Sequence, residues 1–101
     1  MKMRLIALFF AISLINAAAE EQPVTSHMPR DYVESSVLRS VGYSKRRHIL
    51  EIEFASGATY RYFDVAPSVY HDLMAADSKT RYYDLNIRRK YRSARVKPRK
   101  D

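Results

Sequence analysis

Basic and aromatic side chains are the residues in this sequence best suited to a binding function. A Tyr-x-Tyr pair stands at Tyr60 and Tyr62, and basic residues follow one another closely toward the C-terminus. Tyrosine rings displayed on a sheet can stack on bases, and arginine and lysine side chains neutralise phosphates. Eight candidates for polyanion binding follow from this pattern: Arg88, Arg89, Lys90, Arg92, Arg95, Lys97, Arg99 and Lys100.

The positive charge is concentrated at one end of the chain. The 18 Lys and Arg residues exceed the 11 Asp and Glu residues by a net charge of +7. Residues 79–101 contain ten basic and two acidic residues, whereas residues 20–78 contain six basic and nine acidic ones. Such asymmetry is typical of contact with nucleic acid or an anionic membrane surface, and equally of a solvated tail. Both interpretations remain open at this point.

Residue types that serve catalysis or metal binding are also present. Glu51 and Glu53 share one face of an alternating stretch, which places their carboxylates about 7 Å apart. That spacing would suit a catalytic pair, but the neighbouring sequence supplies no pocket. We therefore interpret both as the solvent face of an amphipathic strand. His27, His48 and His71 lack the spacing that would direct two ligands to one metal ion.

The composition excludes several further classes of protein. With 101 residues the chain has room for one small domain and none for a multidomain enzyme. It contains no cysteine, which excludes disulfides, a thiol nucleophile and thiolate zinc sites. Its two glycines form no loop that could cradle a phosphate. We predict a non-enzymatic protein that needs no cofactor and has no evident small-molecule substrate.

The first nineteen residues have the composition of a secretory signal peptide. A basic start precedes a largely apolar run from Leu5 to Ile15, and Ala17 and Ala19 provide the small side chains that a cleavage site needs. The alternative is an uncleaved membrane anchor, which would need about 20 apolar residues. We predict cleavage between Ala19 and Glu20 and export to the periplasm or beyond the cell.

The rest of the chain predicts an α+β fold, with a three-stranded antiparallel β-meander followed by two helices packed on one face. Alternation at Leu50, Ile52 and Phe54 indicates a strand, and Pro67 suits the first turn of a helix. In chain order, we expect a flexible leader at 20–34, strands at 36–43, 48–54 and 59–63, helices at 67–76 and 79–92, and a frayed end whose basic tail is 97–101. The folded domain should span 35–96.

One turn decides where Tyr60 and Tyr62 point. If residues 56–57 form a two-residue hairpin turn, both tyrosines lie opposite the apolar face of the preceding strand and are exposed for stacking. If the loop has an odd number of residues, both tyrosines join the core and Glu51 pairs with Arg61. The two-residue turn is the commoner hairpin, whereas a small domain needs the apolar area of both rings.

An ordered set of short motifs resembles the KTSC domain, a module named after its occurrence at the C-terminus of some lysyl-tRNA synthetases. The resemblance covers about residues 35–96 and includes the Tyr-x-Tyr pair. RNA binding has been suggested for the family because of its tie to the synthetase, and no activity is established. The motifs are Ser35-Ser36, Val41-Gly42-Tyr43, Leu50-Glu51-Ile52-Glu53-Phe54, Gly57, Tyr60-Arg61-Tyr62-Phe63-Asp64-Val65, Pro67-Ser68-Val69-Tyr70, Leu73, Ala76, Ser78-Lys79, Tyr82 and Ile87-Arg88.

Two hypotheses follow for function. In the first, the protein binds RNA or another polyanion through its basic C-terminal helix and tail, so that affinity falls steeply with salt. In the second, it docks a partner protein through its sheet, and the tail serves only solubility or steering. Export favours an extracellular nucleic acid, anionic lipid or glycan over tRNA as the polyanion.

Overall fold

The computed structural model describes residues 21–99. The predicted signal peptide and its cleavage site between Ala19 and Glu20 lie outside this range, as does Lys100. Their assignments therefore remain predictions from the sequence.

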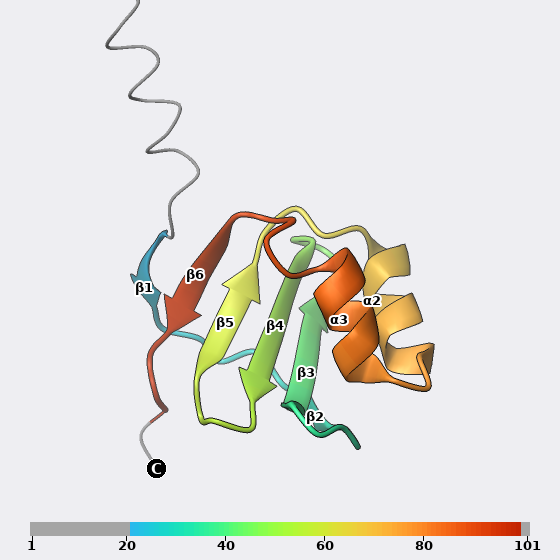
Figure 1. Ribbon diagram of the computed structural model, residues 1–101. Helices are drawn as coiled ribbons and strands as arrows, with labels where there is room; N and C mark the ends of the chain where they lie inside the picture. Colours follow the sequence, from blue (N-terminus) through green and yellow to red (C-terminus); the bar gives the residue numbers. More distant parts are fainter. Residues whose placement is uncertain (1–20, 100–101) are drawn as a thin grey trace, which may run out of the picture.

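Within residues 21–99, six strands form one layer and two helices form the other (Figure 1). The order across the sheet is β1-β6-β5-β4-β3-β2. Neighbouring strands are antiparallel except β1, which runs parallel to β6. The elements are β1 (Glu21–Val24), β2 (Asp31–Tyr32), β3 (Leu38–Ser44), β4 (Ile49–Phe54), β5 (Thr59–Tyr62), α2 (Pro67–Ala75), α3 (Lys79–Asn86) and β6 (Ser93–Val96).

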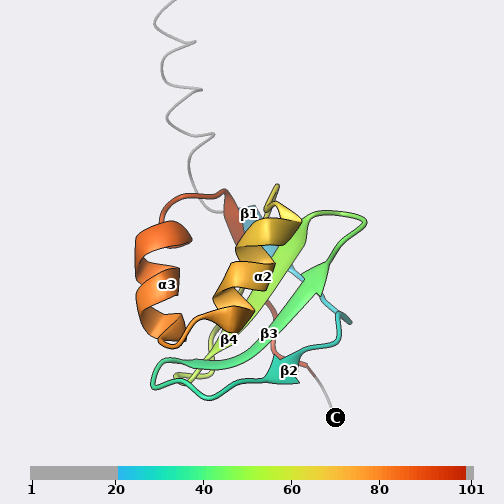
Figure 2. The same ribbon diagram turned by 90° about the vertical axis from the view of Figure 1, so that its right-hand side faces the viewer.

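The predicted α+β class is confirmed, but the sheet is twice as large as the expected meander. β3, β4 and β5 form that meander, and α2 and α3 cover one of its faces (Figure 2). The core between the two layers is apolar, as the alternation of β4 predicted. Its buried members are Leu38, Val41, Leu50, Ile52, Tyr62, Val65, Leu73 and Ile87.

The segment that we predicted to be a flexible leader contributes two strands instead. β2 is only two residues long, and both of its side chains are exposed. β1 pairs with β6 through the backbone, with Glu21 opposite Ala94 and Val24 opposite Val96. Backbone pairing of short edge strands leaves no apolar alternation in the sequence, which explains why the pattern did not show them.

The second helix is shorter than predicted, and a strand replaces the expected frayed end. α3 begins at the Ser78 cap, whose hydroxyl accepts a hydrogen bond from the Arg81 amide at 3.2 Å. It ends at Asn86 because the amides of Ile87 and Arg88 both donate to the Tyr83 carbonyl, 2.9 Å away in each case. The chain then turns through Arg89 at a φ of 60°. The basic residues 88–90 therefore occupy a loop rather than a helix.

The β4–β5 loop has an odd number of residues, so the register follows the second of the two alternatives. The Phe54 amide donates to the Ala58 carbonyl at 2.8 Å, and Gly57 closes the loop at a φ of 99°. A three-residue hairpin loop of this kind uses a residue in the left-handed region, which favours glycine. Tyr60 and Tyr62 consequently lie on the core side of β5.

Candidate functional site

A strap formed by residues 25–30 crosses the face of the sheet that the helices leave open. It links β1 at one edge to β2 at the other, so it passes over the central strands (Figure 2). Gly42 permits this close approach, because a Cβ there would collide with the Pro29 carbonyl oxygen and would lie 2.9 Å from the Arg30 Cγ. The second face of the sheet is therefore covered by the chain itself.

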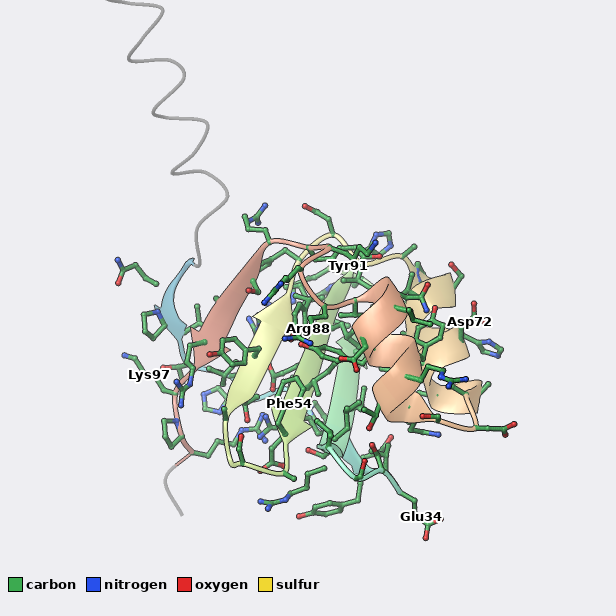
Figure 3. All side chains as sticks on the ribbon, viewed as in Figure 1. Glu34, Phe54, Asp72, Arg88, Tyr91 and Lys97 are labelled. Atoms are coloured by element: carbon green, nitrogen blue, oxygen red, sulfur yellow. The ribbon has the colours of Figure 1, made fainter. Side chains whose placement is uncertain are left out.

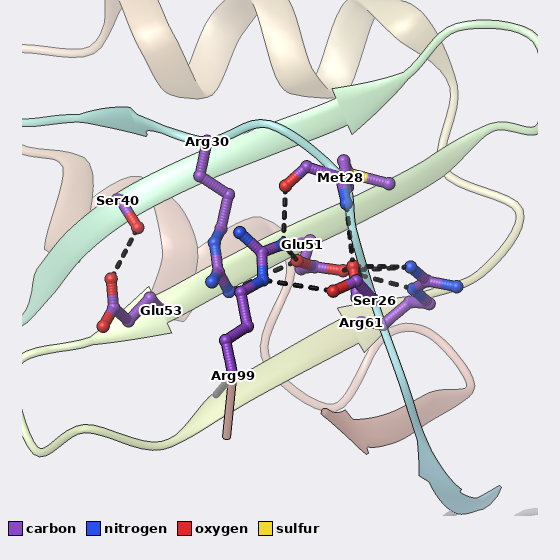
Figure 4. A network of polar contacts seen from close by, with 8 residues as sticks. All are labelled: Ser26, Met28, Arg30, Ser40, Glu51, Glu53, Arg61 and Arg99. Carbon is purple, nitrogen blue, oxygen red and sulfur yellow. Dashed lines mark hydrogen bonds and ion pairs between the residues drawn. The ribbon is translucent and has the colours of Figure 1, made fainter. Parts of the chain in front are cut away.

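Glu51 is the centre of a polar cluster beneath this strap, which we name the clasp (Glu51, Ser26, Arg30, Arg61 and Arg99; Figure 4). Its side chain is fully buried. The Ser26 hydroxyl donates to its Oε1 at 2.6 Å, and Arg61 Nη2 lies 3.1 Å from the same oxygen. Arg30 Nη1 and Arg99 Nη2 approach the other oxygen at 3.2 and 3.5 Å. The prediction that Glu51 faces solvent was wrong, because the strap covers it.

Glu53 lies nearer the rim of the same face and has its own partners. The Ser40 hydroxyl donates to it at 2.8 Å, and an Arg39 nitrogen lies 3.6 Å from its carboxylate. Its side chain is partly exposed, unlike that of Glu51. The two carboxylates are thus each held by separate donors.

The clasp also ties the C-terminal segment to the strap. Arg99 donates to the backbone carbonyls of Ser26 at 3.1 Å and Met28 at 2.6 Å. Arg99 was predicted to contact a polyanion, yet its guanidinium is engaged with the chain's own carbonyls. Three guanidinium groups share the one Glu51 carboxylate, so the clasp carries a surplus of positive charge.

Tyr60 and Tyr62 pack against the helical layer instead of offering a stacking platform. Tyr62 is buried, and its hydroxyl lies 3.0 Å from that of Tyr83. The half-buried Tyr60 makes an edge contact with Phe54, their ring centroids 6.3 Å apart. The Arg95 guanidinium lies over the same ring, with its central carbon 5.7 Å from the Tyr60 centroid. The aromatic motif is therefore mainly structural.

Other tyrosines attach the helices to the end of the sheet. Tyr43 stacks on Tyr70 with centroids 4.9 Å apart, and its hydroxyl donates to the Val65 carbonyl at 2.6 Å. Burial raises the pKa of Tyr43 above its ordinary value of 10.0. Burial, and then the nearby Asp72 and Tyr91, likewise raise the pKa of Tyr82.

Three connections at one end of the sheet bring exposed basic residues together. The β3–β4 turn, the β5–α2 connection and the α3–β6 loop meet there, because the Val65 amide bonds the His48 carbonyl at 2.9 Å and the Phe63 amide bonds the Arg92 carbonyl at 3.0 Å. We name this surface the basic end, formed by Lys45, Arg46, Arg47, Arg89, Lys90 and Arg92. The three residues of the β3–β4 turn were not among the candidates from the sequence, although Ser44-Lys45-Arg46-Arg47 reads as a basic turn.

The predicted polyanion-binding residues are dispersed over the described structure. Arg88 lies 3.8 Å from Asp84, which belongs to α3, and Lys97 lies just after β6, near the β1 edge of the sheet (Figure 3). Arg92 pairs with Asp64 at 3.6 Å and stacks on Phe63 with its guanidinium carbon 4.6 Å from the ring centroid. Arg89 and Lys90 remain the candidates that the α3–β6 loop presents to solvent at the basic end.

Two open hollows flank the strap. One, of about 470 Å³, lies between residues 25–27 and 97–99. The other, of about 460 Å³, lies between the strap and the β3–β4 turn, and Arg47 and Arg61 are among its lining residues. In residues 21–99 no group of three histidine, cysteine or acidic residues could hold a metal ion. The same part of the chain contains no helix long and apolar enough to span a membrane.

The fold and its motifs define a small α+β module of one recognised family. The KTSC domain model matches residues 34–91, which run from just before β3 to the loop after α3. The chain belongs to the KTSC domain family, as the motifs of its sequence indicated. Ser26, Arg30 and Arg99, three of the clasp residues, lie outside the residues that the family model matches.

Relatives of known sequence or structure agree with this assignment. A KTSC domain protein from Yersinia pestis is similar in structure, with a TM-score of 0.68 and 34% identity over 69% of this chain and 99% of that one. An uncharacterised protein of Stutzerimonas stutzeri is 49% identical over 56% of this chain and 80% of its own length. A lysine–tRNA ligase of Nostoc punctiforme is 41% identical over 58% of this chain, which corresponds to 10% of the ligase.

Proposed function

We propose that this protein is an exported, non-enzymatic KTSC module that binds RNA or another polyanion at its basic end. The observation that carries the proposal is the convergence of two exposed basic segments, residues 45–47 and 89–92, at one end of the sheet. Neither segment alone is unusual, but together they present several positive charges within reach of one phosphate backbone. The similarity to part of a lysine–tRNA ligase supports nucleic acid as the first polyanion to test.

The mode of binding is electrostatic rather than base-specific. Tyr62 is buried in the core and the half-buried Tyr60 packs against it, which argues against base stacking on the sheet. Each phosphate that a lysine or arginine neutralises releases counterions, and the affinity falls with the logarithm of the salt concentration. Binding should therefore be weakly selective for sequence and strongly dependent on salt.

A titration of labelled RNA and DNA at two salt concentrations tests this proposal. The double variant Arg89→Gln/Lys90→Gln should reduce the slope of log affinity against log salt by about 1.5. The variant Arg81→Gln is the matched control, because Arg81 is exposed but lies in the first turn of α3, away from the basic end. Absence of binding at low salt, or an equal loss with the control, would refute the proposal.

Docking of a partner protein is the second candidate, and an exposed edge strand of the sheet supports it. The helices lie over one face of the meander and the strap crosses the other (Figure 1), and β1 and β2 form the edges of the sheet. β2 is an edge strand, and its Tyr32 side chain is 83% exposed. A partner strand could pair there and contact that ring. Tyr32→Ser should abolish capture of such a partner while leaving polyanion binding intact, and the reverse result would exclude this candidate.

Export is proposed from the sequence and can be examined directly. Cleavage after Ala19 would leave Glu20 as the first residue, one position before β1 begins at Glu21. Expression of the full chain, followed by fractionation and N-terminal sequencing of the protein found outside the cytoplasm, should give Glu20. A protein retained in the cytoplasm with an intact N-terminus would contradict the proposal.

A further inference from the structure

The hollow between the strap and the β3–β4 turn has the chemistry of an anion site. It has a volume of about 460 Å³ and is open to solvent. Arg61, Arg47, His27, Ser44 and Thr25 contribute to its lining, which contains no acidic residue. A volume of this size is within the range of small-ligand sites.

Arg61 lines this hollow with two of its five N–H donors unused. A guanidinium has five N–H donors. Arg61 Nε donates to Glu51 Oε1 at 3.3 Å, and Nη2 donates to the same oxygen at 3.1 Å and to the Ser26 hydroxyl at 2.9 Å. Nη1 has no hydrogen-bond partner among the described residues. It is also not one of the fully buried atoms that lack a partner, so part of its surface is accessible. Figure 4 shows that nitrogen without a dashed line, pointing away from Glu51.

The guanidinium is also held in place, which favours ligand binding. The Arg61 side chain is only 10% exposed, and its contacts with Glu51 and Ser26 fix its orientation. A donor that is already ordered loses little conformational freedom when a ligand arrives. The two free N–H groups of Nη1 are thus ready to bind an oxyanion.

The charge balance around the hollow favours an anion as well. Glu51 is the carboxylate partner of Arg61, but it is shared with Arg30 and Arg99. Arg47 adds a further positive charge at the rim, where its side chain is exposed. Interactions between charges are stronger in a partly buried site than in bulk water. A bound anion would offset the surplus of positive charge.

We propose that this hollow binds a single phosphate group, as inorganic phosphate or as the terminal phosphate of a larger ligand. Arg61 Nη1 and the Arg47 guanidinium bind the phosphate oxygens, since the planar fork of arginine matches this geometry. The hydroxyls of Ser44 and Thr25 are further donors along the wall. This site does not depend on polyanion binding at the basic end, although Arg47 belongs to both.

Titration of the ¹⁵N-labelled protein with sodium phosphate, followed by NMR, tests the proposal against sodium chloride at matched ionic strength. Saturable shifts should be confined to the strap and the β3–β4 turn. Arg47→Gln should weaken phosphate binding about tenfold, and Arg46→Gln should leave it unchanged because Arg46 does not line the hollow. A response no different from that to chloride, or equal losses in the two variants, would overturn the proposal.

Two further arms of the experiment identify the source of the phosphate and separate this site from the basic end. An oligonucleotide with a 5′-phosphate that binds more tightly than its 5′-hydroxyl counterpart assigns the hollow to a nucleic-acid terminus. Equal binding of the two, with saturable binding of inorganic phosphate, assigns it to a small phosphate. Polyanion binding should fall to a similar extent in Arg46→Gln and Arg47→Gln, whereas phosphate binding should distinguish them.

Discussion

Glu51 and Arg61 lie directly opposite each other on β4 and β5, with Oε1 and Nη2 3.1 Å apart beneath the strap. The Glu51 side chain has no exposed surface, and Arg30 and Arg99 supply further positive charge to it. A buried carboxylate is tolerated when hydrogen bonds and opposite charges compensate its desolvation. This arrangement makes the second face of the sheet a small polar core.

Replacing Glu51 by Gln should lower the free energy of unfolding by about 3 kcal/mol, because the partner guanidiniums would lose their buried counter-charge. Glu53→Gln is the matched control on the same strand. Its partner Arg39 is half exposed, so the ion pair should contribute less than about 1 kcal/mol. Urea denaturation measures both values. Similar losses in the two variants would mean that burial under the strap does not distinguish them.

Gly42→Ala should displace the strap while leaving the helical layer in place. The new Cβ would overlap the Pro29 carbonyl oxygen, and the strap backbone would have to move. We expect a loss of about 1–3 kcal/mol and faster cleavage by trypsin after Arg30. Gly57→Ala provides the contrast, because it strains a φ of 99° with open space around it. Gly57→Ala should lower the stability of the protein but should not change the rate at which trypsin cleaves the native protein after Arg30.

Arg99→Ala should destabilise the protein, although it removes a residue of the predicted basic tail. Its hydrogen bonds to the Ser26 and Met28 carbonyls would be lost, and since the side chain is 38% exposed the cost should be about 1 kcal/mol. Lys97→Ala removes an equal charge two residues earlier, at an exposed position. Thermal denaturation should show a lower midpoint for Arg99→Ala alone. Equal midpoints would exclude a structural role for Arg99.

The stability of the protein should decline at alkaline pH through Tyr43. Burial raises its pKa above 10.0 in the folded state, so the unfolded chain loses this proton first. Below pH 10.0 the Tyr43 hydroxyl is protonated in both states and does not make the free energy of unfolding depend on pH. Above pH 10.0 the unfolded chain loses the proton more readily, so the free energy of unfolding falls as the pH rises. Tyr43→Phe should remove part of this decline and, through loss of the bond to Val65, cost about 1 kcal/mol at neutral pH.

Urea denaturation between pH 8 and about pH 11 checks the Tyr43 prediction. Tyr32→Phe is the control for the loss of one hydroxyl, because the Tyr32 side chain is 83% exposed. An alkaline decline in Tyr43→Phe as steep as in the unmodified protein would contradict the assignment.

The sequence predicted the elements whose pattern is set by burial against the helices. The alternation of Leu50, Ile52 and Phe54 placed β4, and Pro67 and Ser78 marked the starts of the two helices. The pairing of Glu51 with Arg61 was one of two alternatives, and the odd loop closed by Gly57 decided between them.

The remainder depended on contacts between residues far apart in the chain. Nothing near Glu51 in the sequence indicates that Ser26 and Arg99 cover it, so the carboxylate looked like part of a solvent face. The hydrogen bonds that the β5–α2 connection donates to the α3–β6 loop and to the β3–β4 turn are likewise long-range, so the basic end was only half recognised. The helix ends at Asn86, where the Arg88 amide also donates to the Tyr83 carbonyl and the left-handed Arg89 follows, and helical periodicity cannot reveal this local geometry.

The strap imposes an order on folding. Its partner Arg99 lies 73 residues after Ser26, and β1 needs β6 as its neighbour. A chain synthesised from its N-terminus therefore contains the strap early, but the contacts of the strap with Arg99 and β6 form only after the C-terminal segment has been made. Until then the polar face of the meander, with Glu51 on it, is open to water. Loop-closure entropy makes such distant contacts slow to form, so docking of the strap should be the final step, and a chain that still lacks Arg99 cannot complete it.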